Sequence, residues 1–140
     1  MMSSNLNPVN VTCAIIEKGN DVLVVQRSET MKLPLKWEFP GGKMEAGESE
    51  IACIHREIRE ELCIDIELIA KLTPSVHTYP LGTVLMIPFV ARQIGGELRL
   101  AEHKQYLYLP KQQLEALDWA EADIPVLREY LQWCEGKRAL

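Results

Sequence analysis

The chain has 140 residues, of which 47% are hydrophobic and 25% are charged, and its formal net charge is −5. This length and apolar content fit one domain with its own core, so we expect a single domain over residues 1–140 and no second one. The acidic balance argues against binding to nucleic acid polymers, which requires clustered Lys and Arg, but it is compatible with a small anionic ligand held through metal.

We expect no targeting signal at the start of the sequence. Residues 1–10 lack the basic start and apolar run of a signal peptide, and the longest apolar stretch, residues 84–91, is short and contains Pro88. We therefore expect a cytoplasmic protein that spans no membrane. Residues 1–8 are expected to form a frayed N-terminus.

Apolar and β-branched runs predict the strands, and glycine-containing segments predict the turns between them. Residues 18–21, Lys-Gly-Asn-Asp, give a strong hairpin signal between the first two runs. The expected strands are Val9–Ile16, Val22–Gln26, Ile66–Leu72, Val76–Tyr79, Val84–Gln93 and Tyr106–Leu109, with a turn at Gly95-Gly96. Helices are expected at residues 111–117 and 124–134. Strands and helices in this mixed order indicate an α/β sandwich.

A loop and a further helix are expected after the second strand. Residues 37–43 read Trp-Glu-Phe-Pro-Gly-Gly-Lys, where Pro40 fixes φ and the glycine pair permits a tight turn with its backbone open to a ligand. Apolar residues then recur at steps of three and four, which predicts a helix with one buried side. That side consists of Ile51, Ile54, Ile58 and Leu62.

Three glutamates of this helix, Glu57, Glu60 and Glu61, fall within one sector, because an α-helix advances about 100° per residue. Like charges at this spacing destabilise a helix by a few tenths of a kcal/mol per pair unless cations lie between them. Carboxylate oxygens are the hard ligands that Mg²⁺ and Mn²⁺ bind. The spacing therefore predicts a divalent metal site, with an ordinary solvated acidic face as the alternative.

The segment from Gly42 to Ile64 resembles the Nudix box of the Nudix hydrolases, whose pattern is GX5EX7REUXEEXGU with U an aliphatic residue. The matching positions are Gly42, Glu48, Arg56-Glu57-Ile58, Glu60-Glu61 and Ile64. The one departure is Cys63, where the family has glycine. A glycine just past a helix end usually adopts a left-handed conformation, which costs a residue with a Cβ about 1 kcal/mol or more. Cys63 therefore calls the local turn into question, while the set of carboxylates is complete.

The resemblance implies a mixed sheet between helices, with the box forming loop, helix and loop. It also implies attack of water on a phosphorus of a diphosphate linkage, with Mg²⁺ as cofactor and Mn²⁺ as a possible substitute. The implied metal ligands are Glu57, Glu60, Glu61 and the backbone carbonyl of Gly41. Arg56 would orient the carboxylates, and Glu48 would hold Arg56. The alternative for this last pair is a surface salt bridge worth under about 1 kcal/mol.

The general base has two candidates, because family members use either a glutamate of the box or one on a distant loop. Glu102 is the distant candidate, since many MutT-like members carry a glutamate ahead of a strand with an aromatic residue, here the strand at 106–109. A catalytic or metal-binding role for Glu102 competes with the role of an ordinary loop acid.

The histidines and cysteines match no metal site. The histidines, at positions 55, 77 and 103, lack ligand spacing, so we expect each to be satisfied or exposed. The cysteines, at positions 13, 53, 63 and 134, form no CxxC pair. Reduced core or surface thiols are therefore expected at all four positions.

Residues 37–43 also resemble the MutT branch of the family, whose members convert nucleoside triphosphates into monophosphates and pyrophosphate. Several of these enzymes remove oxidised nucleotides such as 8-oxo-dGTP. By this resemblance, Gly42 and Lys43 bind substrate, Arg27 contacts phosphate and Phe39 lies beside the base. A solvated strand end is the alternative for Arg27, and core packing is the alternative for Phe39.

Residues 117–125 resemble a MutT-like segment in which an Asn or Asp ahead of a proline reads the base edge, and Asp123 occupies that place. An ionised carboxylate only accepts hydrogen bonds, so Asp123 would donate one only if its pKa were raised. The alternative role is the N-cap of the last helix. CTP pyrophosphohydrolases share both this segment and the 37–43 run, which makes CTP or dCTP a rival to 8-oxo-dGTP.

The sequence thus predicts a metal-dependent nucleoside triphosphate pyrophosphohydrolase that acts on a small-molecule nucleotide as a monomer or homodimer. One alternative is a Nudix module that binds a nucleotide or a protein without turnover, which the complete set of box carboxylates disfavours. A hydrolase of another nucleoside diphosphate derivative is the second alternative. It is disfavoured because the chain is little longer than the core fold.

Overall fold

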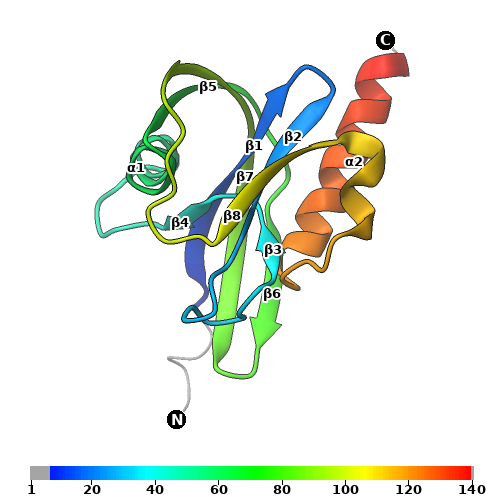
Figure 1. The fold of residues 1–140 in the computed structure, drawn as a ribbon. Coiled ribbons are helices and arrows are strands. Elements are labelled where there is room, and N and C mark those ends of the chain that lie inside the picture. The colour runs from blue at the N-terminus through cyan, green and yellow to red at the C-terminus, as the bar shows by residue number, and fades with distance from the viewer. Residues whose placement is uncertain (1–6, 140) are drawn as a thin grey trace.

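The computed structural model describes residues 7–139, and it is an α/β sandwich, as the sequence predicts. Figure 1 shows a mixed sheet with helix α1 on one side and helix α2 on the other. The frayed terminus expected over residues 1–8 falls almost entirely outside the described residues. Within residues 7–139, no helix is long and apolar enough to cross a membrane.

The elements lie close to their predicted positions. The strands are β1 (Val9–Lys18), β2 (Asp21–Gln26), β3 (Trp37–Glu38), β4 (Gly41–Lys43), β5 (Ile64–Lys71), β6 (Ser75–Tyr79), β7 (Gly82–Gly96) and β8 (Gln105–Pro110). The helices are α1 (Glu50–Leu62), the 3-10 helix η2 (Lys111–Ala116) and α2 (Asp123–Ala139). The two shortest strands, β3 and β4, were not expected, because segments this short show no alternation of apolar residues.

The eight strands form one sheet, whose central order is β3-β2-β1-β7-β5. Strand β4 pairs with β1, β6 pairs with β7, and β8 pairs with β2. The pairing of β1 with β7 is parallel, and the other pairings are antiparallel. The sheet is therefore mixed, and its parallel pair lies at the centre.

Side chains alternate across the central strands and form a separate core on each face. Cys13 and Ile15 of β1 belong to the core that includes residues of α2. Ala14 and Ile16, at the alternate positions of the same strand, belong to the core beneath α1. The helices thus cover opposite faces of the sheet, and each face buries its own apolar cluster.

The glycine pair ahead of α1, where the sequence predicts a tight turn, instead lies in strand β4, which is inserted beside β1. Strand β1 pairs with β2 only at the hairpin end, and further along it pairs with β4, from Val11↔Lys43 to Cys13↔Gly41. Gly41 approaches β1 so closely that a Cβ there would lie 2.0 Å from the carbonyl oxygen of Thr12. Only glycine fits this position, and the contact fixes where the segment leading into α1 begins.

Helix α1 has well-defined ends. The side chain of Ser49 caps its N-terminus by accepting a hydrogen bond from the backbone N–H of Ala52. At the other end, Cys63 has a φ of 61° and its N–H donates to the carbonyl of Arg59. Cys63 therefore adopts the left-handed conformation that the glycine of the box pattern normally provides.

Two sequence expectations need correction. Ile51 is 56% exposed, and Cys53 completes the buried side of α1 together with Ile54, Ile58 and Leu62. Gly95 and Gly96 form no turn, because they end β7 and pair with Asp65 and Ile64. A Cβ at Gly96 would lie 2.6 Å from the carbonyl oxygen of Cys63, so this glycine serves a close approach of two strands.

Candidate active site

The Gly41–Lys43 segment, which forms β4 at the place of the predicted turn, lies directly against a glutamate of α1. A Cβ added to Gly42 would be 2.1 Å from Oε1 of Glu57. Any larger residue at this position would therefore push the carboxylate away. The absence of a side chain at Gly42 is what allows Glu57 to rest against the backbone of the turn.

Arg56 joins the turn to the carboxylates of α1. Its Nε donates to Oε2 of Glu48 at 2.6 Å, and its Nη2 donates to Oε1 of Glu48 at 2.9 Å. Nη1 donates to Oε2 of Glu57 at 2.9 Å and to Oε1 of Glu60 at 3.1 Å. Nη2 also reaches the carbonyl of Lys43 at 3.2 Å. The guanidinium thus donates hydrogen bonds to three carboxylates and to the Gly41–Lys43 segment, which differs from an isolated surface salt bridge.

The network changes the acidity of its carboxyl groups. Hydrogen bonds from Arg56 and from the backbone N–H of Glu45 lower the pKa of Glu48 to about 2. Burial raises the pKa of Glu57, because it outweighs the hydrogen bond from Arg56, and the charges of Glu61 and Glu60 raise it further. A cation beside Glu57 would favour its ionised form.

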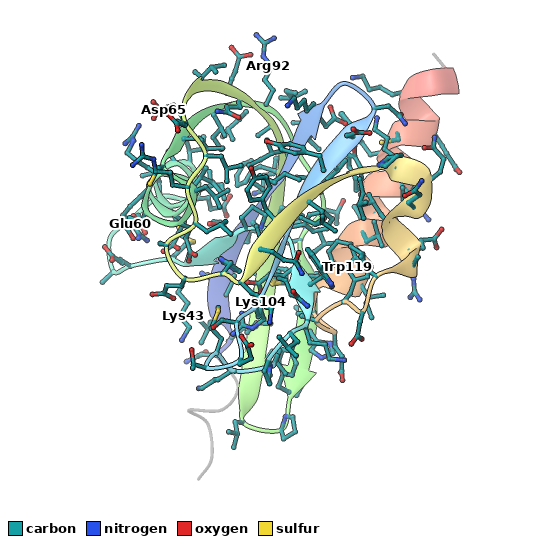
Figure 2. All side chains as sticks on the ribbon, in the orientation of Figure 1. Lys43, Glu60, Asp65, Arg92, Lys104 and Trp119 are labelled. Carbon is teal, nitrogen blue, oxygen red and sulfur yellow. The ribbon has the colours of Figure 1, made fainter. Side chains whose placement is uncertain are left out.

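The other two box carboxylates are less enclosed. The side chain of Glu60 is 60% exposed and that of Glu61 is 21% exposed. Figure 2 shows Glu60 beside α1 and Lys43 below it, near the turn. Oε2 of Glu61 is buried and has no hydrogen-bond partner.

Within the described residues, no three acidic, His or Cys side chains are already gathered into a metal cage. The donor set nevertheless fits a hard divalent cation. Its carboxylates lie on one face of α1, and the raised pKa of Glu57 shows that its charge is not fully compensated by Arg56. Residues of the Gly41–Lys43 turn contact the same group of side chains.

His103 and Glu38 join the candidate site, although the sequence analysis did not place either residue there. Nε2 of His103 lies 2.8 Å from Oε2 of Glu38, and Nδ1 lies 3.3 Å from Oε2 of Glu61. Burial disfavours a charge on His103, but the contacts with Glu38 and Glu61 outweigh it and raise the pKa to about 9. His103 was expected to be satisfied or exposed, but only Nε2 has a hydrogen-bond partner, while the buried Nδ1 faces a box glutamate without a hydrogen bond. No spacing in the sequence links these three positions.

Glu102, the distant candidate for the general base, is exposed in the loop between β7 and β8. Its neighbour His103 holds this loop against Glu61 of the box. Arg27, at the end of β2, is not a solvated strand end. Its Nη1 donates to Oε1 of Glu38 at 2.9 Å, and the side chain is only 19% exposed.

A second cluster lies at the start of α2. Asp123 is 3% exposed, and its Oδ2 accepts a hydrogen bond of 2.9 Å from the backbone N–H of Phe39. Burial and the charge of Glu38 raise its pKa well above the usual range of an aspartate. The Phe39 ring is buried and packs on Trp119 with a centroid distance of 4.8 Å. Figure 2 shows Trp119 on the α2 side of the sheet.

These contacts bear on the alternative roles that the sequence left open for Asp123 and Phe39. The Asp123 carboxyl bonds to the segment after β3, so its partner lies outside α2. Phe39 packs in the core, while its backbone serves Asp123. Lys43 is exposed beside the turn.

The family model of the NUDIX domain matches residues 6–130 of the chain. The chain belongs to the Nudix family. A Nudix protein of this size, with the box intact in its charged positions, is a hydrolase that acts on phosphoric anhydride bonds.

Curated relatives match over most of their length. A Mycobacterium tuberculosis protein provisionally named 8-oxo-dGTP diphosphatase 2 is 35% identical, covering 96% of this Nudix chain and 95% of that protein. The CTP pyrophosphohydrolase of Escherichia coli is 29% identical, covering 88% and 91% respectively. The ADP-ribose pyrophosphatase of Methanocaldococcus jannaschii is 31% identical, covering 94% and 78%.

Solved structures share the same fold. The solution structure of the E. coli ORF135 protein has a TM-score of 0.81 at 27% identity and covers 90% of both chains. The NMR structure of a MutT protein of the Nudix hydrolase family from methicillin-resistant Staphylococcus aureus has a TM-score of 0.71 at 41% identity. It covers 87% of this chain and 94% of that one.

Proposed function

We propose that this Nudix hydrolase is a metal-dependent nucleoside triphosphate pyrophosphohydrolase, which converts an NTP or dNTP and water into the monophosphate and pyrophosphate. The observation that carries the proposal is the Arg56 network, in which one guanidinium orders Glu48, Glu57 and Glu60 beside the backbone of the turn. Cytoplasmic location, and action as a monomer or homodimer, are further predictions from the sequence.

The proposed ligands of the metal are Glu57, Glu60, Glu61 and the carbonyl of Gly41. When bound, Mg²⁺, or Mn²⁺ in its place, would neutralise negative charge on the phosphate oxygens and lower the pKa of a coordinated water. Arg56 keeps Glu57 and Glu60 oriented, and Glu48 keeps Arg56 in place through two hydrogen bonds.

The remaining residues of the proposed site bind the nucleotide or move a proton. Exposed Lys43 and the backbone of Gly42 approach the phosphates, together with Arg27, which is linked to the box through Glu38 and His103. The proton of the attacking water is taken by a box glutamate or by Glu102. The contact of His103 with Glu61 supports a role for Glu102, because it brings the Glu102 loop to the box.

Asp123 and the Phe39 segment are proposed to recognise the base. The raised pKa of Asp123 favours its protonated form, and that form would offer an O–H donor to a carbonyl or ring nitrogen of a base. Because the residue is 3% exposed, a base reaches it only after neighbouring side chains shift. The names of two relatives support 8-oxo-dGTP and CTP as the first substrates to test.

The alternative of a binding module without turnover rested on Cys63. With a φ of 61°, Cys63 keeps the left-handed turn that glycine normally makes, so this departure from the box pattern leaves the backbone in the ordinary path. Hydrolysis of another nucleoside diphosphate derivative stays in the test, because one relative is named an ADP-ribose pyrophosphatase.

The test measures monophosphate and pyrophosphate release, with Mg²⁺ present, from 8-oxo-dGTP, dGTP, CTP, dCTP, 5-methyl-dCTP and ADP-ribose. Glu61→Gln is run in parallel. We expect one triphosphate to dominate and Glu61→Gln to lose most of the rate. Dominant release of AMP from ADP-ribose would reassign the substrate class, and binding of nucleotides without any turnover would overturn the proposal.

A further inference from the structure

His103 occupies an unusual position in the loop between β7 and β8. Its side chain is 1% exposed, and each ring nitrogen faces a carboxylate. Glu38 of β3 lies on the Nε2 side at 2.8 Å, and Glu61 of α1 lies on the Nδ1 side at 3.3 Å. The imidazole therefore bridges β3 and α1, both of which are far from His103 in the sequence.

The backbone on both sides of His103 is fixed. The N–H of Ala101 donates to the carbonyl of Glu61 at 3.1 Å, and the N–H of Lys104 donates to the carbonyl of Gln26 at 2.9 Å. The loop is thus tied to the end of α1 and to the end of β2. Because the loop is held at two points, the position of the imidazole is set by the fold.

The contact with Glu61 is the weaker of the two. Nδ1 of His103 and Oε2 of Glu61 are both buried, and neither has a hydrogen bond of normal geometry. Each is the polar atom that faces the other, at 3.3 Å. Because a buried polar atom without a partner is costly, a small movement of the flexible Glu61 side chain toward His103 is favourable.

Glu38 anchors the opposite side of the imidazole. Its Oε2 contacts Nε2 of His103, while its Oε1 accepts a hydrogen bond from Nη1 of Arg27. A histidine held by a carboxylate on one side can orient a ligand group on the other, as outer partners of metal ligands generally do. The chain of contacts from Arg27 through Glu38 and His103 to Glu61 is an arrangement of this kind.

We propose that His103 is a positioning residue, which, anchored by Glu38, fixes one oxygen of Glu61 so that the other oxygen is presented to the divalent cation. The inference rests on the proposed function, because it takes Glu61 as a metal ligand. His103 itself contacts neither the metal nor the nucleotide.

Two substitutions separate the two contacts of the imidazole. The amide nitrogen of Asn matches the place of Nδ1, so His103→Asn keeps a donor for Glu61 and loses the one for Glu38. The amide nitrogen of Gln matches Nε2, so His103→Gln keeps the donor for Glu38 and loses the one for Glu61. Lys104→Ala, at the next residue of the loop, is the control, because the side chain of Lys104 forms an ion pair with Glu29 at the surface.

The primary measurement is Mn²⁺ affinity of the full chain, from the EPR signal of free Mn²⁺ without nucleotide. We expect His103→Gln to weaken Mn²⁺ binding by about 10- to 100-fold, the usual effect of losing an outer partner of a ligand. His103→Asn should stay within about threefold of the wild type, and Lys104→Ala should not differ from it. Equal losses in the Asn and Gln variants, or wild-type affinity in the Gln variant, would overturn the proposal.

A double-mutant cycle guards against a general loss of structure. In the Glu61→Gln background, His103→Gln should cause no further loss of Mn²⁺ affinity if His103 acts through Glu61. A full further loss would show that the substitution disturbs the site by another route, which also contradicts the proposal. Thermal unfolding of each variant shows whether it is folded at the temperature of the measurement.

Turnover of CTP and 8-oxo-dGTP by the same proteins separates this proposal from the proposed function. If the wild type hydrolyses a nucleotide but His103→Gln binds Mn²⁺ normally, the role of His103 is wrong and the proposed function stands. If the wild type hydrolyses nothing while His103→Gln loses Mn²⁺ affinity, His103 positions a metal ligand and the proposed function is wrong.

Discussion

Glu48, just before α1, and Asp123, at the start of α2, lie beside helices on opposite faces of the sheet, and their surroundings shift the pKa values of their carboxyl groups in opposite directions. Glu48 is bonded by Arg56, which lowers its pKa to about 2. Asp123 is buried with a backbone N–H as partner, and burial raises its pKa well above its usual range. The surroundings therefore favour the anionic form of Glu48 and the neutral form of Asp123.

This difference matches the two kinds of chemistry that the proposed substrate needs. Anionic carboxylates attract the cation that neutralises a triphosphate, whereas a neutral carboxyl can donate a hydrogen bond to a base without attracting that cation. Glu38 lies between the two regions, because it contacts His103 and Arg27 and its charge also contributes to the raised pKa of Asp123.

The largest effect is expected from breaking the Arg56 fork. Arg56→Lys keeps the positive charge but cannot bond Glu48 in two places while also reaching Glu57 and Glu60. We expect kcat with the best nucleotide of the panel to fall by about 10²-fold, the usual cost of misplacing reacting groups by about 1 Å. Steady-state kinetics measures this loss.

Arg59→Lys is the matched control for that change. Arg59 lies in the same helix and donates from Nε and Nη2 to Oδ1 of Asp65, but its side chain is 67% exposed. Its loss should leave kcat within about twofold, because an exposed ion pair contributes little. Similar losses from both substitutions would mean that the fork at Arg56 has no special role.

A smaller effect is expected from Gly42→Ala. The new Cβ would lie 2.1 Å from Oε1 of Glu57, so the flexible carboxylate moves while the backbone is kept. We expect a loss of kcat on the order of tenfold with little change in stability. Gly136→Ala, where a Cβ meets open space in α2, should leave kcat unchanged and raise stability by about 0.5 to 1 kcal/mol. Unchanged kcat in Gly42→Ala would contradict the assigned place of Glu57.

The two regions also differ in how far the sequence predicts them. The box is local, so the helical spacing of Glu57, Glu60 and Glu61 follows from the period of an α-helix. The ion pair of Arg56 with Glu48 was likewise expected from the resemblance, and the structure contains it. Where a site lies within one turn and one helix, sequence reasoning predicts its contacts.

The contacts of His103 and Asp123 are not local. His103 meets Glu38 across 65 positions of sequence, and Asp123 meets the N–H of Phe39 across 84. They depend on how the sheet brings the segment after β2 beside the loop before β8 and the start of α2, and no residue pattern specifies that approach. The prediction that Ile51 is buried was wrong for a related reason. Helical periodicity predicts the apolar face of α1, but it does not predict how much of that face the sheet covers.

A pH dependence sharpens the comparison at Asp123. A raised folded pKa means that the native state favours the protonated carboxyl, so its contribution to stability is full below the unfolded pKa and declines as pH rises above it. Asp123→Asn keeps an acceptor for the Phe39 N–H and removes this decline. We expect the stability of the variant to rise relative to that of the wild type between about pH 5 and about pH 8, because only the wild type loses stability as the pH rises above the unfolded pKa.

Urea unfolding at the two pH values measures this difference. Asp118→Asn is the control, because the side chain of Asp118 is 73% exposed and pairs with Lys36 at the surface. It should show no comparable change with pH. A constant difference between Asp123→Asn and the wild type would indicate that Asp123 is ionised in the folded protein, and would remove the donor proposed to read the base.

The smallest effect is expected at the end of the box helix. Cys63 has a φ of 61°, so its Cβ is strained where glycine would not be, although glycine also gains entropy in the unfolded chain. We expect Cys63→Gly to raise the free energy of unfolding by about 0.5 to 1 kcal/mol with kcat unchanged. Gly19→Ala tests the same strain in reverse, because Gly19 has a φ of 62° with nothing within 4 Å of a new Cβ, and it should destabilise by a similar amount. If Cys63→Gly instead altered kcat, the backbone conformation at residue 63 would influence the positions of the α1 carboxylates. The helix end would then belong to the catalytic machinery and not only to the fold.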